Sequence, residues 1–259
     1  MYPLEEIEEY VKEKTKNVKL ITHAFDHLKR VAIGARWFVK ILDGSKKEQE
    51  LAYIAGLLHD VVRLDTEKIP HSEASAEKAK KILRRFQLNR EDVDKITLAI
   101  RNHSKPVEWK SVLHQSVFLA DKIFELMGGY VVFRRSMYIG ECRDYKNLPF
   151  KEAMLSYWPI KLKLFTPRTF PKIFRRLVEK RYEIPAIFFE ELKKEREWAI
   201  NLARKAYENG RNHELSLEEF IKEFKPNSEE EWKIKKDALN YIEHMKNEDL
   251  EEFEELIEK

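Results

Sequence analysis

Cysteine and long apolar runs are scarce in this chain, and each scarcity excludes a class of protein. Cys142 is the single cysteine, which excludes an internal disulfide framework and any metal site built from several cysteines. No run approaches the roughly 18 consecutive apolar residues that a membrane helix needs. The N-terminal segment lacks the basic-then-apolar order of a secretory signal, so we expect a cytoplasmic protein that makes no membrane contact.

The rest of the composition is typical of a protein with a sizeable core. The 259 residues are 43% hydrophobic and 37% charged, which allows one large domain or two small ones. The formal net charge of +3 is small and gives no argument for a nucleic-acid partner. Glutamine is rare while lysine and glutamate abound, a bias that fits a heat-adapted protein.

The fold class follows from periodicity. Apolar residues mostly recur at helical spacing and only 7 glycines interrupt them, so we predict an all-α protein. Segment 130–138 is rich in β-branched and aromatic residues, and its composition leaves a strand or a helix open. The expected helices begin near Pro3 and cover roughly 20–42, 48–63, 71–86, 90–103, 111–127 and 184–210. A composition change near residues 144–149 divides the chain into parts 1–144 and 145–259.

Histidine is concentrated in the first half of the chain. Neutral imidazole and carboxylate are the usual ligands of Fe, Mn, Zn and Ni, so imidazoles clustered among apolar helices suggest a metal site. The six histidines that precede residue 115 are His23, His27, His59, His71, His103 and His114. The other two lie in highly charged stretches and are expected on the surface.

Two acidic residues stand in equally apolar surroundings. Asp60 follows His59 directly in "GLLHDVV", and Asp121 lies within "FLADKIF". Burying an ionisable group without a partner is costly, so such residues need a hydrogen-bonding network or a metal ion. Within one helix, His59 and Asp60 would project about 100° apart and supply two adjacent ligands.

The order of these residues resembles a known family. His27, then His59 and Asp60, then Asp121 is similar to the H…HD…D pattern of the HD superfamily of metal-dependent phosphohydrolases. The resemblance covers residues 20–135, roughly half of the chain, and it favours His27 over His23 as the first ligand. It implies an all-α HD-domain helical bundle, with the additional helices of the C-terminal part packed on it.

Two further histidines refine the resemblance. His71 and His103 are similar to the extra ligands of the H-HD-H-H-D subset, which holds two metals, and the segments around them resemble the enzymes that split diadenosine tetraphosphate symmetrically. No Gly-Tyr-Pro motif is present, and no second histidine follows His103 directly. These departures argue against the cyclic-di-GMP phosphodiesterases that carry such features.

The resemblance implies a set of ligands for one or two divalent transition metals. The set is His27, His59, Asp60, His71, His103 and Asp121, with Asp60 bridging the two metals. Fe or Mn is implied first, with Ni, Co, Mg and Zn as alternatives, because nitrogen and oxygen ligands alone do not choose among them. A hydroxide activated by the metals would attack phosphorus in line with the leaving group.

The expected substrate is a phosphorylated small molecule, with a nucleotide favoured. Asp60 and Lys122 are the candidate catalytic residues. The candidate substrate contacts are Arg134, Arg135 and Arg63, because cationic groups pair with phosphate, and His114, which lies seven residues before Asp121 on the same helix face. The C-terminal helices would cover the core, shape the entrance to the pocket or form the contact of a homodimer.

Every assignment has a less specific alternative. His59 and Asp60 could form a hydrogen-bonded core pair, and His71 and His103 could cap or complement helix ends. His114 could be an ordinary core residue, and the candidate lysine and arginines could be solvated. From a different class of function, segment 157–181 mixes aromatic and basic residues as a nucleic-acid groove does, and the metal site would then be structural or vestigial. We regard nucleic acid as the less favoured partner.

Overall fold

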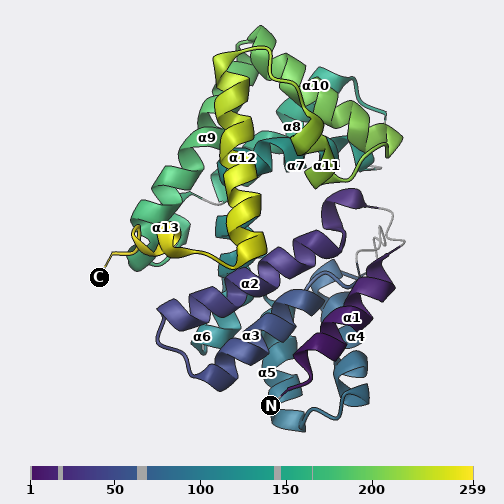
Figure 1. Cartoon of the computed structure of the whole chain (residues 1–259), viewed down its shortest axis with the longest axis vertical. Helices are drawn as coiled ribbons and strands as arrows, with labels where there is room; N and C mark the ends of the chain where they lie inside the picture. Colours follow the sequence, from purple (N-terminus) through teal and green to yellow (C-terminus); the bar gives the residue numbers. More distant parts are fainter. Residues whose placement is uncertain (1, 17–19, 63–68, 143–146, 165, 259) are drawn as a thin grey trace. The chain divides into compact units, whose positions relative to one another are not determined.

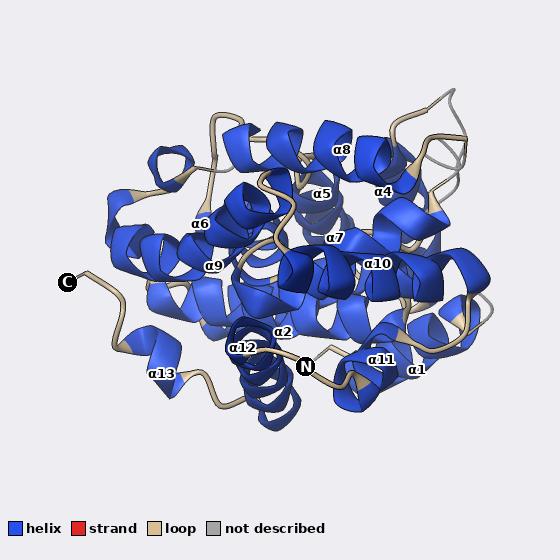
Figure 2. Cartoon of the chain, turned by 90° about the horizontal axis from the view of Figure 1, so that it is seen from above, coloured by secondary structure: helices blue, strands red, loops and turns tan. Residues whose placement is uncertain are grey.

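All the described secondary structure is helical. The computed structural model describes residues 2–16, 20–62, 69–142, 147–164 and 166–258, with the backbone alone described at 159–164 and 167. Helices and loops account for these ranges, which contain no strand (Figures 1 and 2). The prediction of an all-α protein is therefore confirmed. None of the described helices combines the length and the apolar character that a membrane crossing requires.

The chain packs as two compact units. The first unit contains Met1–Lys19 and His23–Glu125, and the second contains Leu20–Thr22 and Leu126–Lys259. The boundary expected near residue 144 falls among residues outside the description. By packing, the division lies earlier, because the helix that begins at Gly128 contacts the helices of the second unit.

The first unit is a bundle in which α2 lies along α3. The π-helix and α6 pack on α2, while α5 packs on α3 and α4. Its helices are α1 (Leu4–Thr15), α2 (Phe25–Ile41), α3 (Lys46–Leu58), α4 (His71–Arg85), α5 (Arg90–Arg101), α6 (Val112–Leu119) and the π-helix η2 (Ala120–Phe124). The short 3₁₀ turn η1 (Ile21–His23) precedes α2.

The second unit is arranged around α7, which contacts α8, α9, α10, α11 and α12. Because α7 is buried on almost every side, its β-branched and aromatic residues at 130–138 form a core helix rather than a strand. The helices are α7 (Gly128–Glu141), α8 (Phe150–Leu164), α9 (Arg175–Lys193), α10 (Glu197–Asn212), α11 (Leu217–Glu223), α12 (Glu229–Asn247) and α13 (Glu251–Glu254). Two 3₁₀ turns, η4 (Pro167–Thr169) and η5 (Lys172–Phe174), precede α9.

Two of the expected helices are divided in the structure. The expected helix at 111–127 consists of α6 and the π-helix η2. Gly128 then begins α7 with a φ of 75°, a backbone conformation that glycine adopts without strain. The carboxylate of Asp237 accepts a hydrogen bond from the Gly129 amide at 2.6 Å and satisfies this helix start. The expected helix at 184–210 breaks near Glu195, which has a φ of 56° and separates α9 from α10.

The crossing of α2 and α3 depends on a glycine. A Cβ atom on Gly56 would lie 2.4 Å from the Cα atom and 2.6 Å from the amide nitrogen of Ala32. These contacts are with backbone, which has little freedom to move, so only glycine permits this separation of the helices. The crossing lies three residues before His59 and five residues after His27, and it therefore fixes the distance between those two side chains.

We predict that Gly56→Ala destabilises the protein by about 1–3 kcal/mol, because the added methyl group forces α2 and α3 apart. Urea denaturation measures this change in the free energy of unfolding. Lys46→Ala, on the exposed first turn of α3, is the control and should alter stability by less than about 0.5 kcal/mol. Equal stability of the Gly56→Ala and Lys46→Ala proteins would contradict the close-approach argument.

Candidate metal centre

The His59–Asp60 pair lies at the end of α3 rather than inside a helix. The expected helix at 48–63 ends at Leu58, His59 is its C-cap residue, and Asp60 lies in the following turn. The Nδ1 atom of His59 lies 2.7 Å from the carbonyl oxygen of Gly56. Donation of the Nδ1–H to this oxygen satisfies a carbonyl of the last helical turn and leaves Nε2 as an electron-pair donor.

His103 repeats this arrangement at the end of α5. Its Nδ1 atom lies 2.6 Å from the carbonyl oxygen of Ile100, again three residues earlier. Both imidazoles therefore cap helix carbonyls through one nitrogen and present the other nitrogen to the interior. The suggested cap role of His103 and its suggested ligand role use different atoms of one ring, so the two roles are compatible.

His27, on the first turn of α2, is anchored by a buried acid. Its Nδ1 atom lies 2.8 Å from Oε2 of Glu125, a residue with no exposed surface. The Nε atom of Arg30 donates to Oε1 of the same carboxylate at 2.8 Å. Glu125 thus selects the ring tautomer of His27, and Arg30 compensates the charge of the buried acid.

Glu125 was not among the sequence-predicted site residues. Its position four residues after Asp121 was the available signal, since this spacing places two side chains on one face of a helix. Ser104 was also missed, and its Oγ atom lies 3.2 Å from Nε2 of His71. Nothing in the local sequence distinguishes that serine from a surface residue.

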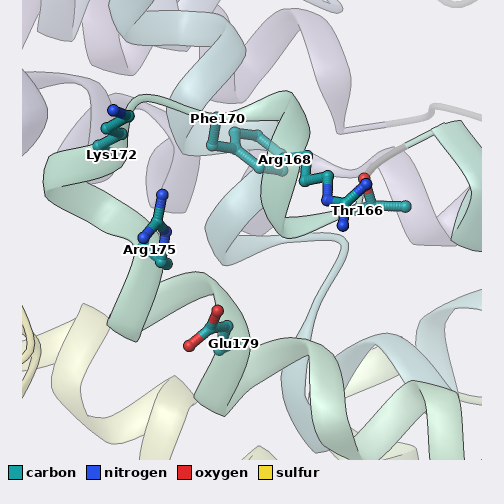
Figure 3. Close-up of a pocket in the computed structure, with 6 residues that line it drawn as sticks. All are labelled: Thr166, Arg168, Phe170, Lys172, Arg175 and Glu179. Atoms are coloured by element: carbon teal, nitrogen blue, oxygen red, sulfur yellow. The ribbon is translucent and has the colours of Figure 1, made fainter.

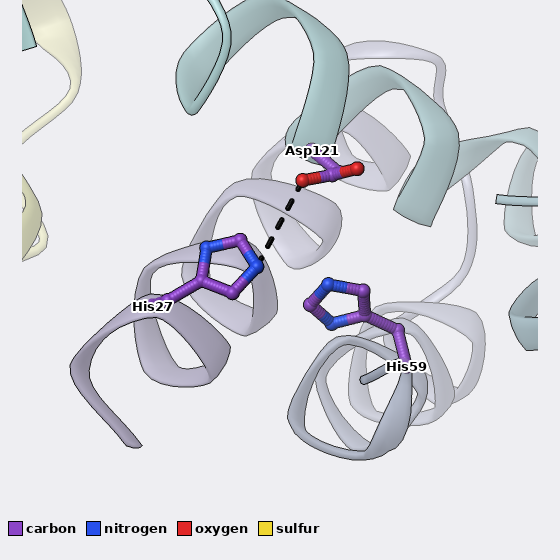
Figure 4. Close-up of side chains that lie close together, drawn as sticks. All are labelled: His27, His59 and Asp121. Carbon is purple, nitrogen blue, oxygen red and sulfur yellow. Dashed lines mark ion pairs between the residues drawn. The ribbon is translucent and has the colours of Figure 1, made fainter. Parts of the chain in front are cut away.

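The anchored rings converge with two carboxylates into two overlapping groups. One group is His27, His59 and Asp121, which come from α2, the end of α3 and the π-helix, as Figure 4 shows. The other is His59, Asp60 and His103. Within each group the candidate ligand atoms lie within 4.8 Å of one another, and all five residues are buried.

The separations between ligand atoms fit a metal better than direct hydrogen bonds. Nε2 of His27 lies 3.9 Å from Oδ1 of Asp121, and Nε2 of His103 lies 3.5 Å from Oδ1 of Asp60. Such pairs are beyond good hydrogen-bond length. Ligands bonded to one ion at roughly 2.0–2.2 Å lie roughly 3–4 Å from one another. The Nε2 atom of His59 is buried and has no hydrogen-bond partner among the described residues, as expected for an atom prepared for a ligand.

The electrostatics also suit metal binding. Burial lowers the pKa of His59 to about 3, against the opposing effect of the Asp60 charge, so the ring is neutral at physiological pH. Burial acts to raise the pKa of Asp121, but the Lys122 ammonium lowers it well below its usual value. Neutral imidazole and ionised carboxylate are the forms in which these residues bind metals.

His71 lies at the accessible edge of the centre. Its Nε2 atom is 3.7 Å from Oδ1 of Asp60, and 32% of its side chain is exposed. The structure therefore brings His71 close to Asp60 without placing it in either three-residue group. Its ligand role stays a prediction.

The remaining candidate residues have other contacts. Lys122 is buried and forms an ion pair with Asp121. Both ring nitrogens of His114 contact polar groups, the Asn102 side chain and the Lys110 amide, each at 3.0 Å, which is the pattern of a core histidine. His114 belongs to neither group of candidate ligands.

Two of the predicted arginines lie in the second unit, and the third is not described. The Arg134 Nε atom donates to the carbonyl oxygen of Thr22 at 3.2 Å. Arg135 donates to the Tyr157 hydroxyl and also lies over that ring, 5.2 Å from its centroid. Arg63 lies outside the described residues. The substrate-binding roles of these three arginines stay predictions.

Comparisons with known proteins place this centre in a family context. Residues 24–125 match the family model of the HD domain, a range that includes both groups of candidate ligands and supports the HD superfamily. The fold is accordingly an all-α HD bundle with further helices. HD domains are generally those of metal-dependent phosphohydrolases and bind divalent metals. The similarity to enzymes that split diadenosine tetraphosphate is not tested by this match.

A search of curated proteins gave no match. Among solved structures, that of Bacillus subtilis YpgQ in complex with ADP is similar, with 16% sequence identity and a TM-score of 0.48. The similarity covers 74% of this chain and 97% of the YpgQ chain.

We predict that Glu125→Gln weakens divalent-metal affinity about 10–100-fold, the effect typical of outer-sphere carboxylates. The amide keeps the shape of the side chain but loses the charge that holds the His27 ring and pairs with Arg30. Competition with a chelator measures the affinity. Asp92→Asn removes another fully buried carboxylate of the same unit, one that pairs with Lys47, and should leave metal affinity unchanged. An equal loss in both variants would attribute the effect to general destabilisation.

Proposed function

We propose that this protein is a metal-dependent phosphohydrolase that acts on a nucleotide or related phosphorylated small molecule through metal-activated water. One observation carries the proposal: three imidazoles, each anchored through Nδ1, turn their Nε2 atoms toward two buried carboxylates. The match of this segment to the HD domain supports the same class of reaction.

The donor atoms fit one or two divalent ions. His27, His59 and Asp121 would hold one ion, and Asp60 with His103 would hold the second, with His71 at its exposed side. Divalent ions supply Lewis acidity toward phosphoryl oxygens and lower the pKa of bound water. The set of nitrogen and oxygen ligands suits Fe or Mn, and Ni, Co, Mg and Zn are alternatives.

Lys122 contributes a buried positive charge beside this centre. Its ammonium pairs with Asp121 and is only 7% exposed, so water screens it weakly. A fixed charge at such a place stabilises negative charge that develops on the phosphoryl group or on the leaving group. Lys122 is for this reason the candidate for leaving-group stabilisation. Asp60 would act as a metal ligand close to His71.

The exposed side of the centre indicates where the substrate would enter. Of the six proposed ligands, His71 is the most accessible to solvent, and its neighbour Ser104 offers a hydroxyl to a bound oxyanion. His27, His59 and His103 are almost completely buried and face the interior. The leaving group would therefore lie toward His71, and its chemical identity would set the substrate preference.

Asp60→Ala should reduce hydrolysis by more than about 100-fold. Asp60 is a proposed direct metal ligand, and loss of a direct ligand should have a larger effect than the 10–100-fold typical of outer-sphere partners. Turnover of a panel of nucleotides and sugar phosphates, measured with Mn²⁺ or Fe²⁺ present, checks this. Asp94→Ala removes an exposed carboxylate of α5 and is the matched control. The proposal is wrong if Asp60→Ala retains both metal and full activity.

His103→Ala should remove one of two metals and leave the other. This variant loses a ligand of the second group, whereas the group formed by His27, His59 and Asp121 stays intact. Elemental analysis of protein purified without chelators should give about two transition-metal ions per wild-type chain and about one in the variant. One ion in both proteins would argue instead that His103 and His71 contact the substrate.

The expectations of a homodimer and of a cytoplasmic location stay predictions, to be tested by light scattering and by cell fractionation.

A further inference from the structure

A pocket of about 700 Å³ lies in the second unit, where the chain enters α9. Its lining residues are Thr166, Arg168, Phe170, Lys172, Arg175 and Glu179 (Figure 3). The Phe170 side chain is buried and supplies an apolar wall, whereas the charged residues are exposed. In Figure 3, Lys172 and Arg175 lie on one side of the Phe170 ring and Arg168 with Thr166 on the other.

Within the described residues, the positive charges of this pocket have no carboxylate partners. Within the described part of the chain, Arg168, Lys172 and Arg175 make no ion pair with a carboxylate. Other exposed cations of the same unit do make such pairs, for example Lys180 with Glu252 and Lys246 with Glu218. Three cations therefore face one cavity with a single carboxylate, Glu179, on its wall.

The start of α9 increases this concentration of positive charge. α9 has no acidic residue in its first turn and begins with Arg175 and Arg176, and its N-cap residue Phe174 provides no side-chain cap. The starts of α10, α11 and α12 carry glutamates, which complement the positive end of the helix dipole. At α9, cations stand at the positive end of the helix dipole, where the other helices carry anions. A bound anion would reduce this repulsion between like charges.

A second pocket of the same unit shows the contrast. It is lined by Arg196, Asn201 and Glu231, among others. There Arg196 pairs with Glu191, and Glu231 accepts hydrogen bonds from Asn201 and Asn227. These polar groups have partners within the protein, in contrast to the cations of the pocket before α9.

We infer that the pocket before α9 binds a small organic phosphate that carries at least two negative charges. Arginine and lysine side chains are the usual partners of phosphate, the Thr166 hydroxyl adds a hydrogen-bond donor, and Phe170 offers apolar surface to the organic part. The volume lies within the roughly 300–1,000 Å³ of small-molecule sites. Because the cations face one cavity instead of following an extended strip, a small ligand suits them better than a nucleic-acid strand.

This site does not depend on the proposed metal centre, which is built from residues of the first unit. Four of the basic and aromatic residues of segment 157–181 line it, namely Arg168, Phe170, Lys172 and Arg175. The carboxylate of Glu179 on the wall accepts a hydrogen bond from a hydroxyl or amine of the ligand. The organic part of the ligand would accordingly carry such a donor.

Isothermal titration of the full-length protein with inorganic pyrophosphate tests the inference. Arg175→Gln and Lys172→Gln should each weaken binding at this site by roughly ten-fold, the effect of losing a hydrogen bond to a charged group. Arg176→Gln is the matched control, because it removes the same charge from the adjacent exposed residue, which does not line the pocket. It should change affinity by less than about two-fold.

The Asp60→Ala protein separates this site from the metal centre. Pyrophosphate binding that persists in Asp60→Ala and is lost in Arg175→Gln supports the inference, whether or not the protein is a hydrolase. Binding that disappears in Asp60→Ala and is unaffected by Arg175→Gln overturns it. Tight binding of a single-stranded RNA, weakened equally by Arg175→Gln and Arg176→Gln, would identify a general nucleic-acid surface and also overturn it.

Discussion

The close approach of α2 and α3 is the constraint on which the candidate metal centre depends. Gly56 lets the backbone of α3 contact the backbone of α2 at Ala32. His27 and His59 lie on either side of this contact, and their ring centroids are 5.0 Å apart. A wider crossing would carry the two rings beyond the reach of a common ion. The geometry of the centre is therefore set by main-chain packing before any ligand is bound.

The imidazole rings must also be oriented correctly, and the protein achieves this with a hydrogen bond at the Nδ1 atom of each ring. His59 and His103 use carbonyl oxygens of their own helix ends, while His27 uses the carboxylate of Glu125. These three interactions leave each Nε2 atom directed inward. The burial that keeps His59 neutral also makes it costly to leave its inward nitrogen without a partner. The contacts that stabilise the fold therefore also orient the ring nitrogens that would bind a metal.

Periodicity was sufficient to predict the helical class. The five residues of the two ligand groups were predicted from the apolar surroundings of His59, Asp60 and Asp121 and from the resemblance to the HD superfamily. Periodicity reveals helices, and His59–Asp60 within an apolar run signals buried polar groups. Helix ends were less predictable. Gly128 starts a helix because Asp237, more than 100 residues later, accepts the amide of Gly129. The role of Glu125 was also difficult to predict, because its partner His27 lies 98 residues earlier in the sequence.

The pairing of Thr22 with Glu141 has a consequence for how the chain is partitioned. Glu141 accepts hydrogen bonds from the Thr22 amide at 3.1 Å and from its hydroxyl at 2.8 Å, so Leu20–Thr22 packs with the second unit. The second unit is therefore discontinuous in the chain. A fragment that begins at Leu126 would lack three of its own residues and leave the buried Glu141 without these donors. During synthesis Thr22 emerges 119 residues before Glu141, so this pairing is a contact of high sequence separation that forms late.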